Sequence, residues 1–394
     1  MVIFPFQRRA WVEIDLDAVR HNFFIIKEKC GCSKVCCVVK ANAYGHGAIQ
    51  LSKIYEQIKA DFLAVSNIGE ALQLRNADIS LPILILGYTD PKCASILAQY
   101  DISQCVYSKE YADQLAYEAD SINVKIKIHL KIDTGMGRLG FKCKNFSTHE
   151  LEDAVSVCRY SCFVHEGIFT HFSSADKGNQ GYRYTKQQFI YFNFAVDYLA
   201  KRQIMFSIRH CANSAAILNC PEMNMDMVRA GIVLYGLSPS EIPLCKTELL
   251  PVLKLKSIVA HIKMIDKGDA VSYGCTFIAD RAMKIATIPI GYADGLLRAN
   301  RDHLSIEVCG HQAPIVGHIC MDQCMVDITD IDDVSLGCTV TIYGTNFDNS
   351  IDRIAKANRT INYEILCNIG ERVPRVYLQN GTVIEVVDKL ITRY

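Results

Sequence analysis

Residues 36–48 read CCVVKANAYGHGA, and the chain changes character in the middle of this stretch. Four apolar residues, Cys36 to Val39, predict a short, fully buried β-strand. Lys40 follows directly, and the small and glycine-rich residues after it favour a sharp turn over a continuing strand. A lysine at a strand end is by default a solvated side chain. Burial, however, lowers the pKa of an amine and makes it reactive, so the rest of the sequence has to distinguish the two interpretations.

Seven further apolar runs follow the first, and helical patterns such as residues 48–60, 109–120 and 185–203 lie between them. The eight strand candidates are residues 35–43, 61–67, 81–88, 102–108, 124–133, 162–172, 208–215 and 227–236. Eight strands that alternate with helices predict an N-terminal (β/α)8 barrel of the TIM type over residues 1–248. A doubly wound open sheet alternates in the same way and stands as the alternative fold.

The pattern changes at about residue 250, where short strand patterns follow one another with turn residues between them; the first two are residues 254–265 and 270–277. One helical pattern, residues 350–358, interrupts them. Asn380-Gly381 lies between RVYLQ and TVIEVV and predicts a two-residue β-hairpin. We therefore expect a mostly β C-terminal domain over residues 249–394, with the crossing in LLPVLKL, residues 249–255. The first strand, AWVEIDL (residues 10–16), could belong to either domain.

Composition excludes several classes of function. Half of the 394 residues are hydrophobic, and 42 Lys and Arg balance 42 Asp and Glu without a basic stripe, so neither nucleic acid nor an anionic membrane is expected as a partner. The longest apolar runs are too short to span a bilayer, and the N-terminus lacks the order of a secretion signal. Eighteen scattered cysteines without a C-x-x-C motif predict a reducing cytoplasm, no disulfide framework and no metal site.

Functional groups of a (β/α)8 barrel lie at the C-terminal ends of its strands. The predicted ends place an amine, an imidazole, a hydroxyl and guanidinium groups on one rim; the residues are Lys40, Lys131, Arg138 in the loop DTGMGRLG (133–140), His171, Ser214 and Arg229. Each has a structural default. His171 could be a satisfied structural histidine, Ser214 a helix N-cap, and Arg229 the partner of a carboxylate.

The small residues after the seventh and eighth strands suit phosphate capture by backbone N–H groups. A lysine opposite a phosphate site suggests pyridoxal 5'-phosphate, because the amine can bind the aldehyde covalently while the phosphate anchors the other end. A phosphosugar aldolase would use the same lysine and the same phosphate corner, so the residues alone leave both open.

Nine blocks of the sequence resemble those of one family. VVKANAYGHG is similar to the cofactor-lysine motif of the alanine racemases, which are fold-type III pyridoxal-phosphate enzymes. The resemblance runs from residue 11 to about 375. Eight other blocks of that family follow the lysine motif in the same order: KIDTGMGRLGF, THFSSAD, HCANSAA, MVRAGIVLYGL, VSYGCTF, TIPIGYADG, ICMDQCMVD and NYEILCNIGERVPR.

The resemblance implies two acid/base groups. Lys40 would hold the cofactor and move a proton on one face of the substrate α-carbon, and Tyr273 would act on the opposite face. Racemisation requires such a pair because the proton leaves one face and returns on the other. A cation should lower the pKa of the tyrosine, and the family suggests His171. Tyr273 would come from the partner subunit of a head-to-tail homodimer; without the resemblance it is an ordinary strand tyrosine.

Further roles follow from the same resemblance. Arg229 would face the pyridine nitrogen and weaken the ring as an electron sink. The cofactor contacts, mostly to the phosphate, would be Tyr44, His171, Ser214, Gly231, Ile232 and Tyr363. Arg138 would bind the ring hydroxyl and the substrate carboxylate, oriented by Lys131 if that lysine is carbamylated. Met321 of the partner would contact the carboxylate through its backbone.

One position departs from the family pattern at the substrate entrance. His318 stands where many members carry an arginine, whereas the other entrance positions match; these are Asp176, Tyr292, Arg298 and Ile361.

The expected activity is the interconversion of L-alanine and D-alanine, which supplies D-alanine for peptidoglycan in a bacterium. A serine or broader-specificity racemase is the nearest alternative, and Tyr363 argues against it because a phenol beside the cofactor leaves little room beyond a methyl group. A fold-type III decarboxylase would not need Tyr273. A single-domain pyridoxal-phosphate-binding protein would not need the β domain.

Overall fold

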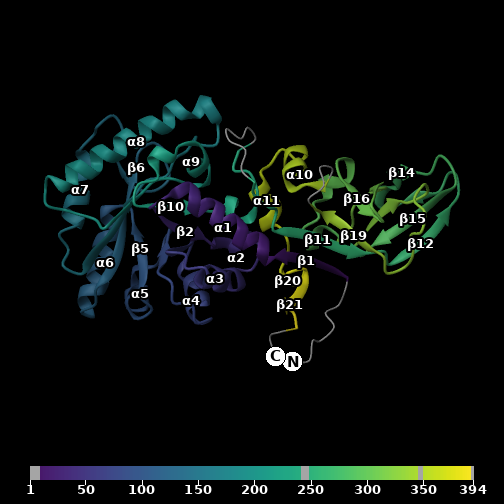
Figure 1. The fold of residues 1–394 in the computed structure, drawn as a ribbon, viewed down its shortest axis with the longest axis horizontal. Coiled ribbons are helices and arrows are strands. Elements are labelled where there is room, and N and C mark those ends of the chain that lie inside the picture. Colours follow the sequence, from purple (N-terminus) through teal and green to yellow (C-terminus); the bar gives the residue numbers. More distant parts are fainter. Residues whose placement is uncertain (1–8, 241–247, 345–348, 392–394) are drawn as a thin grey trace. The chain divides into compact units, whose positions relative to one another are not determined.

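Eight parallel strands form a nearly closed barrel in the computed structural model, which describes residues 9–240, 248–344 and 349–391 (Figure 1). The strands are β2 (Lys34–Val38), β3 (Phe62–Val65), β4 (Ile83–Ile85), β5 (Ile102–Val106), β6 (Ile126–Asp133), β8 (Phe163–Phe169), β9 (Ile208–His210) and β10 (Met227–Ala230). They pair in the order β10-β2-β3-β4-β5-β6-β8-β9. The two ends of this order, β9 and β10, are linked by two backbone hydrogen bonds, from Asp226 N to Arg209 O and from Arg229 N to Ala212 O. The predicted barrel is confirmed, and the open sheet is wrong.

Helices surround the barrel strands in Figure 1. They are α1 (Leu16–Cys30), α3 (Ala48–Gln57), α4 (Ile68–Arg75), α5 (Ala94–Gln99), α6 (Lys109–Ser121), α7 (His149–Val157), α8 (Gly178–Ala200) and α9 (Ser214–Asn219). The side chain of Asn67 caps α4, that of Ser108 caps α6 and that of Asn213 caps α9, each by accepting a hydrogen bond from an amide of the first turn. The N-cap expected at Ser214 is therefore one residue earlier.

Several barrel strands end before the predicted residue. β2 stops at Val38, β9 at His210 and β10 at Ala230, and the η3 turn (Ile232–Tyr235) replaces the predicted end of the eighth strand. Apolar composition alone could not place these ends, because the residues beyond each strand are also buried. Lys40, His171 and Ser214 consequently lie in the segments that follow the strands, whereas Lys131 and Arg229 lie on β6 and β10 themselves.

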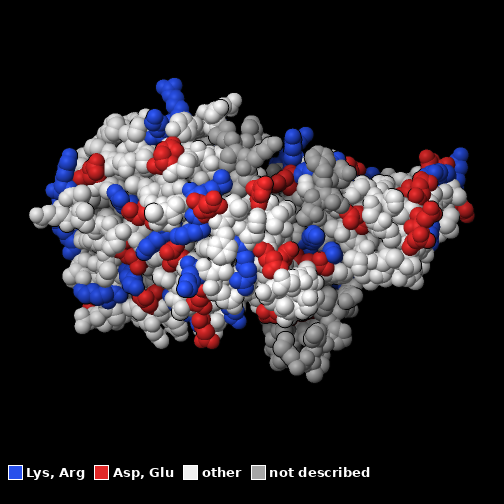
Figure 2. All heavy atoms as spheres, in the orientation of Figure 1, with Lys and Arg blue, Asp and Glu red and all other residues white. Residues whose placement is uncertain are grey.

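The described chain divides into two compact units. The barrel unit comprises Val19–Ala43 and Gly47–Leu250, and the β unit comprises the chain up to Ala18, Tyr44–His46, and the chain from Pro251 onward. No helix among the described residues is both long and apolar enough to cross a membrane. Every described cysteine is a free thiol. On the face in Figure 2, basic and acidic side chains are interspersed over the barrel.

The β unit contains a seven-stranded sheet in the order β17-β16-β19-β11-β1-β20-β21. Its strands are β1 (Ala10–Asp15), β11 (Leu253–Ile258), β16 (Ser305–Val308), β17 (His311–Pro314), β19 (Thr339–Tyr343), β20 (Arg375–Gln379) and β21 (Thr382–Val387). The first strand lies inside this sheet, antiparallel to β11 and parallel to β20. Positive φ at Asn380 and Gly381 closes the predicted hairpin between β20 and β21.

A second sheet in this unit has three strands, β12 (His261–Ile265), β15 (Met283–Ile288) and β18 (Cys324–Asp327). The single run expected over residues 254–265 is thus two strands in different sheets. The strand expected across VSYGCTF is also wrong: Ser272, Gly274 and Cys275 have positive φ, and they leave two-residue strands β13 (Ala270–Val271) and β14 (Phe277–Ile278) around the η4 turn (Tyr273–Cys275). The predicted helix is α10 (Ile351–Ala357), and α11 (Asn362–Cys367) follows it.

Candidate active site

Lys40 begins an unusual turn one residue after the end of β2. In α2 (Lys40–Tyr44), φ lies between 52° and 54° from Ala41 to Tyr44, the left-handed region that costs a residue with a Cβ about 1–2 kcal/mol. Asn42 holds the turn, because its carbonyl accepts from Gly47 N at 2.9 Å and its side chain accepts from Ala48 N at 2.9 Å. The sharp turn expected after the lysine is confirmed, but non-glycine residues make it.

The glycine after this turn is fixed within the β unit. Arg375 Nε donates to Gly45 O at 3.0 Å, and the Tyr377 hydroxyl donates to His46 O at 3.0 Å. Gly45 has φ +85°, and a Cβ there would lie 2.7 Å from the carbonyl oxygen of Leu366. A larger residue at position 45 is therefore excluded both by conformation and by space.

Arg229 lies on β10 with its guanidinium buried in the barrel. NH1 donates to His210 Nδ1 at 2.8 Å, and NH2 donates to Thr170 O at 2.8 Å, Cys211 O at 3.1 Å and His171 Nδ1 at 3.3 Å. Burial lowers the pKa of Arg229 to about 10, so the group is still a cation at neutral pH. Among the described residues, no carboxylate takes the place of the default partner of Arg229, because these acceptors are all neutral.

Lys131 and Arg138 add to this concentration of basic groups. Lys131 is buried with its Nζ 4.3 Å from the centre of the Phe169 ring. Burial, reinforced by the charge of Arg229, holds the pKa of Lys131 well below its usual range. Arg138 is exposed on the glycine-rich loop after β6, where the Asp133 carboxylate fixes the turn by accepting from the amides of residues 135–137.

The charge of the His171 imidazole differs from the one expected. Burial first, and then the positive charges of Arg229 and Lys131, hold the pKa of His171 well below its usual range. Its Nδ1 also accepts from Arg229, which requires that nitrogen to be unprotonated. The imidazole is therefore neutral and is not the cation that the resemblance suggested for Tyr273.

Ser214 and Gly231 form the corner that follows β9 and β10. The Gly231 amide donates to Ser214 Oγ at 2.9 Å, and Gly231 precedes Ile232 at the start of η3. The Tyr235 hydroxyl donates to Val38 O at 2.8 Å, which ties η3 to the end of β2. The hydroxyl and amide groups expected to bind phosphate are thus adjacent at one end of the barrel.

Tyr44 and Tyr363 lie together in the β unit, with ring centroids 5.6 Å apart. Tyr363 is on α11, and Ile361, which is exposed, is the N-cap residue of that helix. Burial, with a smaller contribution from Tyr363, raises the pKa of Tyr44, so its hydroxyl stays protonated.

Tyr273 and Met321 line one surface pocket of the β unit, together with Ser272, Cys320, Asp322 and Gln323. The side chain of Tyr273 is 73% exposed and that of Met321 is 52% exposed, so both are presented outward. Ser272 Oγ donates to His318 O at 2.7 Å and holds the Tyr273 turn against the chain that leads to Met321.

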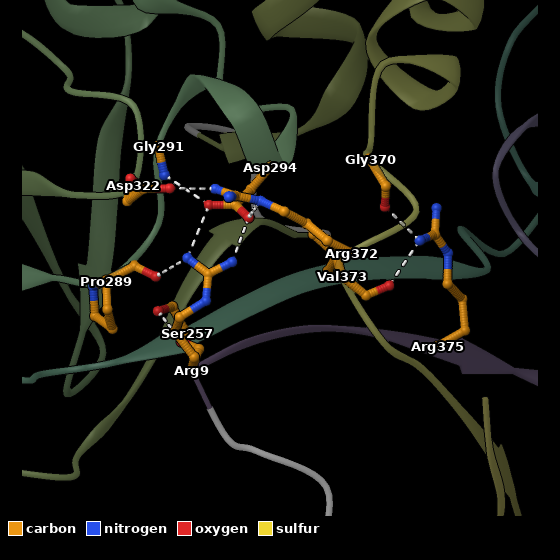
Figure 3. Close-up of polar contacts among 10 residues, drawn as sticks. All are labelled: Arg9, Ser257, Pro289, Gly291, Asp294, Asp322, Gly370, Arg372, Val373 and Arg375. Atoms are coloured by element: carbon orange, nitrogen blue, oxygen red, sulfur yellow. Dashed lines mark hydrogen bonds and ion pairs between the residues drawn. The ribbon is translucent and has the colours of Figure 1, made fainter. Parts of the chain in front are cut away.

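A buried ion cluster supports this pocket (Figure 3). The carboxylate of Asp294 is fully buried; it binds Arg9 NH1 at 3.1 Å and Arg372 Nε at 2.8 Å, and Arg372 NH2 binds Asp322 at 2.6 Å. Backbone hydrogen bonds connect the segment that precedes Asp294 with the pocket: the Tyr292 amide donates to Cys320 O, and the Ala293 amide donates to Met321 O, both at 3.1 Å.

Gly291 makes that backbone contact possible. A Cβ at this position would lie 2.2 Å from Cys320 O and 2.3 Å from Met321 O. The ion cluster therefore fixes the η5 turn (Tyr292–Asp294) and, through it, the backbone of Met321.

The remaining entrance residues separate into the two units. In the β unit, Arg298 begins the η6 turn (Arg298–Asp302), and Arg301 NH1 donates to His318 Nδ1 at 3.2 Å. Burial and the charges of Arg298 and Arg301 lower the pKa of His318, so a neutral imidazole with neighbouring arginines occupies the family's arginine position. In the barrel unit, the Asp176 carboxylate lies 3.8 Å from Lys177 Nζ.

Two groups of sequence-predicted residues result. The barrel unit contains Lys40, Lys131, Arg138, His171, Asp176, Ser214, Arg229, Gly231 and Ile232, and the β unit contains Tyr44, Tyr273, Tyr292, Arg298, His318, Met321, Ile361 and Tyr363. Sequence reasoning missed His129, His210, Glu166 and Asp294. A usable signal existed for Glu166 and His129, since each interrupts an apolar strand run with a titratable side chain.

Family models of known proteins match both parts of the chain. The family model described as alanine racemase, N-terminal domain, matches residues 14–239, and that described as alanine racemase, C-terminal domain, matches residues 252–377. The chain is 42% identical to alanine racemase 1 of Clostridium acetobutylicum over 382 residues, covering 96% of this chain and 98% of that protein.

Two solved structures are similar over nearly the whole chain. Alanine racemase of Clostridium difficile 630 has a TM-score of 0.92 at 39% identity, covering 98% of this chain and 100% of that one. Alanine racemase of Bacillus anthracis with bound L-Ala-P has a TM-score of 0.91 at 38% identity, covering 98% and 99%. With two family models on consecutive units and full-length relatives above 30% identity, the chain belongs to the alanine racemase family.

Proposed function

We propose that this chain interconverts L-alanine and D-alanine with pyridoxal 5'-phosphate, by a two-base mechanism that uses Lys40 and Tyr273. The observation that carries the proposal is the position of the two groups. Each lies in a turn that follows a strand after one intervening residue, and residues with positive φ adjoin it. The charge of Lys40 contributes to lowering the pKa of His171, and Tyr273 is exposed in the pocket that Met321 also lines.

The residues present fit the cofactor. Ser214 Oγ and Gly231 N, adjacent at 2.9 Å, would hold the phosphate with Ile232, Tyr44 and Tyr363, and the Lys40 amine would bind the aldehyde. When bound, the cofactor supplies an electron-withdrawing ring that makes the α-hydrogen of an amino acid acidic. Arg229 donates and is a cation at neutral pH, so it favours an unprotonated ring nitrogen.

The proton transfers belong to side chains of this chain. Lys40 takes or returns the α-proton on one face, and the Tyr273 hydroxyl acts on the opposite face. Arg138 and the backbone of Met321 bind the substrate carboxylate. Tyr273 and Met321 are exposed in the β unit, which supports a homodimer in which they complete the site of the partner subunit. The entrance would be formed by Asp176, Tyr292, Arg298, His318 and Ile361.

Lys131 is the candidate for carbamylation. The pKa of its amine is held well below the usual range, which favours the unprotonated form; that form can attack carbon dioxide, which forms an N–C bond and releases one proton to water. The product is an anion in a region where Arg229 and Arg138 exert positive potential. A carbamate there would compensate these charges and orient Arg138.

The test of the two-base mechanism is Tyr273→Phe. The variant should lose at least about 100-fold in kcat for both L- and D-alanine, because one proton-transfer group is missing. The control is that its elution as a dimer and its cofactor content should equal those of the wild type, so that the loss is assigned to the missing hydroxyl and not to lost assembly. Unchanged racemisation would overturn the mechanism.

Two further measurements separate the alternatives. Borohydride reduction followed by peptide mapping should place the cofactor on Lys40, and a label elsewhere would contradict the assignment. Racemisation rates for alanine and serine, measured side by side, test the substrate; Tyr363 favours alanine, and faster turnover of serine would overturn that choice.

We further propose that the product D-alanine feeds peptidoglycan synthesis in a bacterial cytoplasm. The clostridial relative and the free thiols of all described cysteines support a reducing compartment of this kind.

A further inference from the structure

Arg229 is connected to a carboxylate in the barrel wall by two buried histidines. His210 Nδ1 accepts from Arg229 NH1 at 2.8 Å, His210 Nε2 lies 2.8 Å from His129 Nδ1, and His129 Nε2 lies 3.0 Å from Glu166 Oε2. Both imidazoles are completely buried. Ser103 Oγ donates to the same carboxylate oxygen.

The donors and acceptors of this series permit one arrangement of protons. A guanidinium has no acceptor, so His210 Nδ1 is unprotonated. The proton of His210 must then be on Nε2, because an imidazole without any proton is excluded at neutral pH. His210 therefore donates to His129 Nδ1, and His129 carries its own proton on Nε2 and donates to Glu166. Neither histidine can be a cation while this series is intact.

The charges of the groups agree with this arrangement. Burial, followed by the charge of Arg229, holds the pKa of His210 well below its usual range, and burial lowers the pKa of His129 despite Glu166. Burial alone would raise the pKa of Glu166, but the hydrogen bonds from His129 and Ser103 lower it overall. The carboxylate is thus ionised and both imidazoles are neutral.

The backbone is adapted to this series at two places. The register of β6 against β8 pairs Ile128 with His165 and His129 with Gly167, so Glu166 is the extra residue of a β-bulge. A bulge re-aims a side chain that regular alternation would place elsewhere. A Cβ at Gly167 would lie 2.3 Å from His129 Nδ1, so only glycine leaves room for the imidazole.

Phe169 restrains the middle of the series. Its ring is stacked on that of His210, with centroids 4.8 Å apart and an interplanar angle of 8°. The imidazole can therefore not rotate away from Arg229 without losing this stacking.

We propose that Glu166 is a positioning residue for Arg229 and acts through His129 and His210. The carboxylate fixes both histidines as Nε2–H tautomers and so keeps an acceptor in front of the guanidinium. Arg229 is oriented without an anion in direct contact, and its positive charge stays available to the cofactor ring. This last step rests on the role proposed above for Arg229, whereas the tautomers do not.

The first test is nitrogen NMR of the holoenzyme labelled with ¹⁵N-histidine. At pH 7, His129 and His210, assigned by single substitution, should each carry one proton, on Nε2. A proton on Nδ1 of either residue, or a doubly protonated ring, would overturn the proposal whatever the enzyme catalyses.

The second test interrupts the series at its start. Glu166→Leu should release His129 from its fixed tautomer, and His210 then need not keep Nδ1 unprotonated as the acceptor for the charged Arg229. We expect kcat for alanine racemisation to fall about tenfold with little change in KM. Ser103→Ala is the matched control, because it removes a hydrogen bond to the same carboxylate but lies outside the connection to Arg229. It should keep both Nε2–H tautomers.

If Glu166→Leu does not fold, a third variant tests the same connection through the NMR signals of the two histidines. Gly167→Ala pushes on the His129 ring and should disturb the signals of His129 and His210 together. Unchanged tautomers in both Glu166→Leu and Gly167→Ala, or equal kinetic effects of Glu166→Leu and Ser103→Ala, would overturn the proposal.

Discussion

The two units satisfy arginine side chains in opposite ways. In the β unit, Arg9 and Arg372 donate to the fully buried carboxylate of Asp294, so opposite charges are in contact (Figure 3). In the barrel, Arg229 donates to carbonyl oxygens and imidazole nitrogens, which satisfy its donors and leave its charge uncompensated. The first arrangement fixes a backbone; the second keeps a positive potential where an anionic cofactor and substrate would bind.

The largest expected effect is on the compensated cluster. Asp294→Ala leaves two guanidinium groups without their buried partner and should lower the free energy of unfolding by about 3–5 kcal/mol, measured by urea denaturation. Asp330→Ala is the control, because its ion pair with Arg281 is exposed, and it should leave the urea midpoint nearly unchanged. Equal midpoints for the two variants would show that the cluster does not stabilise the β unit.

The pH dependence of unfolding tests the neutral acceptors of the barrel. His129 and His210 have folded-state pKa values below the unfolded value of about 6.5, so their contribution is complete above that pH and is lost as the pH falls below it. Each buried histidine can add up to about 1.4 kcal/mol of lost stability per pH unit. Glu166, whose pKa is lowered, adds a further loss at more acidic pH.

Urea denaturation at pH 8, 7, 6 and 5.5 measures this slope. Stability should be nearly constant from pH 8 to 7 as far as these groups are concerned and should fall from 6.5 downward. A flat profile between pH 7 and 5.5 would mean that the histidines are not held neutral.

Lys131→Met tests whether burying the Lys131 amine among the basic groups of the barrel lowers the free energy of unfolding. In buffer free of carbon dioxide, the variant should be more stable than the wild type by about 1 kcal/mol at pH 7, because a buried amine is replaced by an apolar side chain. The difference should shrink toward pH 10, since the unfolded lysine then also loses its proton. If bicarbonate selectively stabilises the wild type, a carbamate is indicated; a less stable variant without bicarbonate would contradict the unfavourable burial.

The smallest expected effect concerns a neutral hydrogen bond of the β unit. Tyr377→Phe removes the donor to His46 O and should lower the free energy of unfolding by about 1 kcal/mol. The comparison with Asp294→Ala, by the same urea measurement, separates a neutral contact from a charged one. A loss as large as that of Asp294→Ala would remove the distinction.

Much of the fold could be predicted from local patterns. Eight apolar runs separated by helical periods were enough for the barrel, and Asn380-Gly381 was enough for the last hairpin, because both signals depend on residues adjacent in the chain. The strand expected across VSYGCTF was wrong because positive φ at Ser272 and Cys275 breaks it, and no glycine marks those two positions.

The candidate site was predicted in part. Motifs singled out Lys40, Ser214 and Arg229, since each lies on or shortly after a recognisable strand. They could not identify Asp294 as the partner of Arg9 and Arg372, which are 285 and 78 positions away, or show that two histidines connect Glu166 with Arg229, because the fold brings these residues together from distant parts of the chain. They also could not show that His171 is neutral, which depends on burial and on charges from other strands.

Local patterns were sufficient for the order of strands and helices, for the family, and for the set of residues that could carry chemistry, because periodicity and motifs involve residues close together in the chain. The charge states and the positions of these residues depend on the folded chain. The pKa of a side chain and the tautomer of a histidine depend on neighbours that the fold brings from distant strands. The segment CCVVKANAYGHGA illustrates both: its strand and lysine were predicted, whereas the left-handed turn after Lys40 and the fixation of Gly45 by Arg375 required the folded chain.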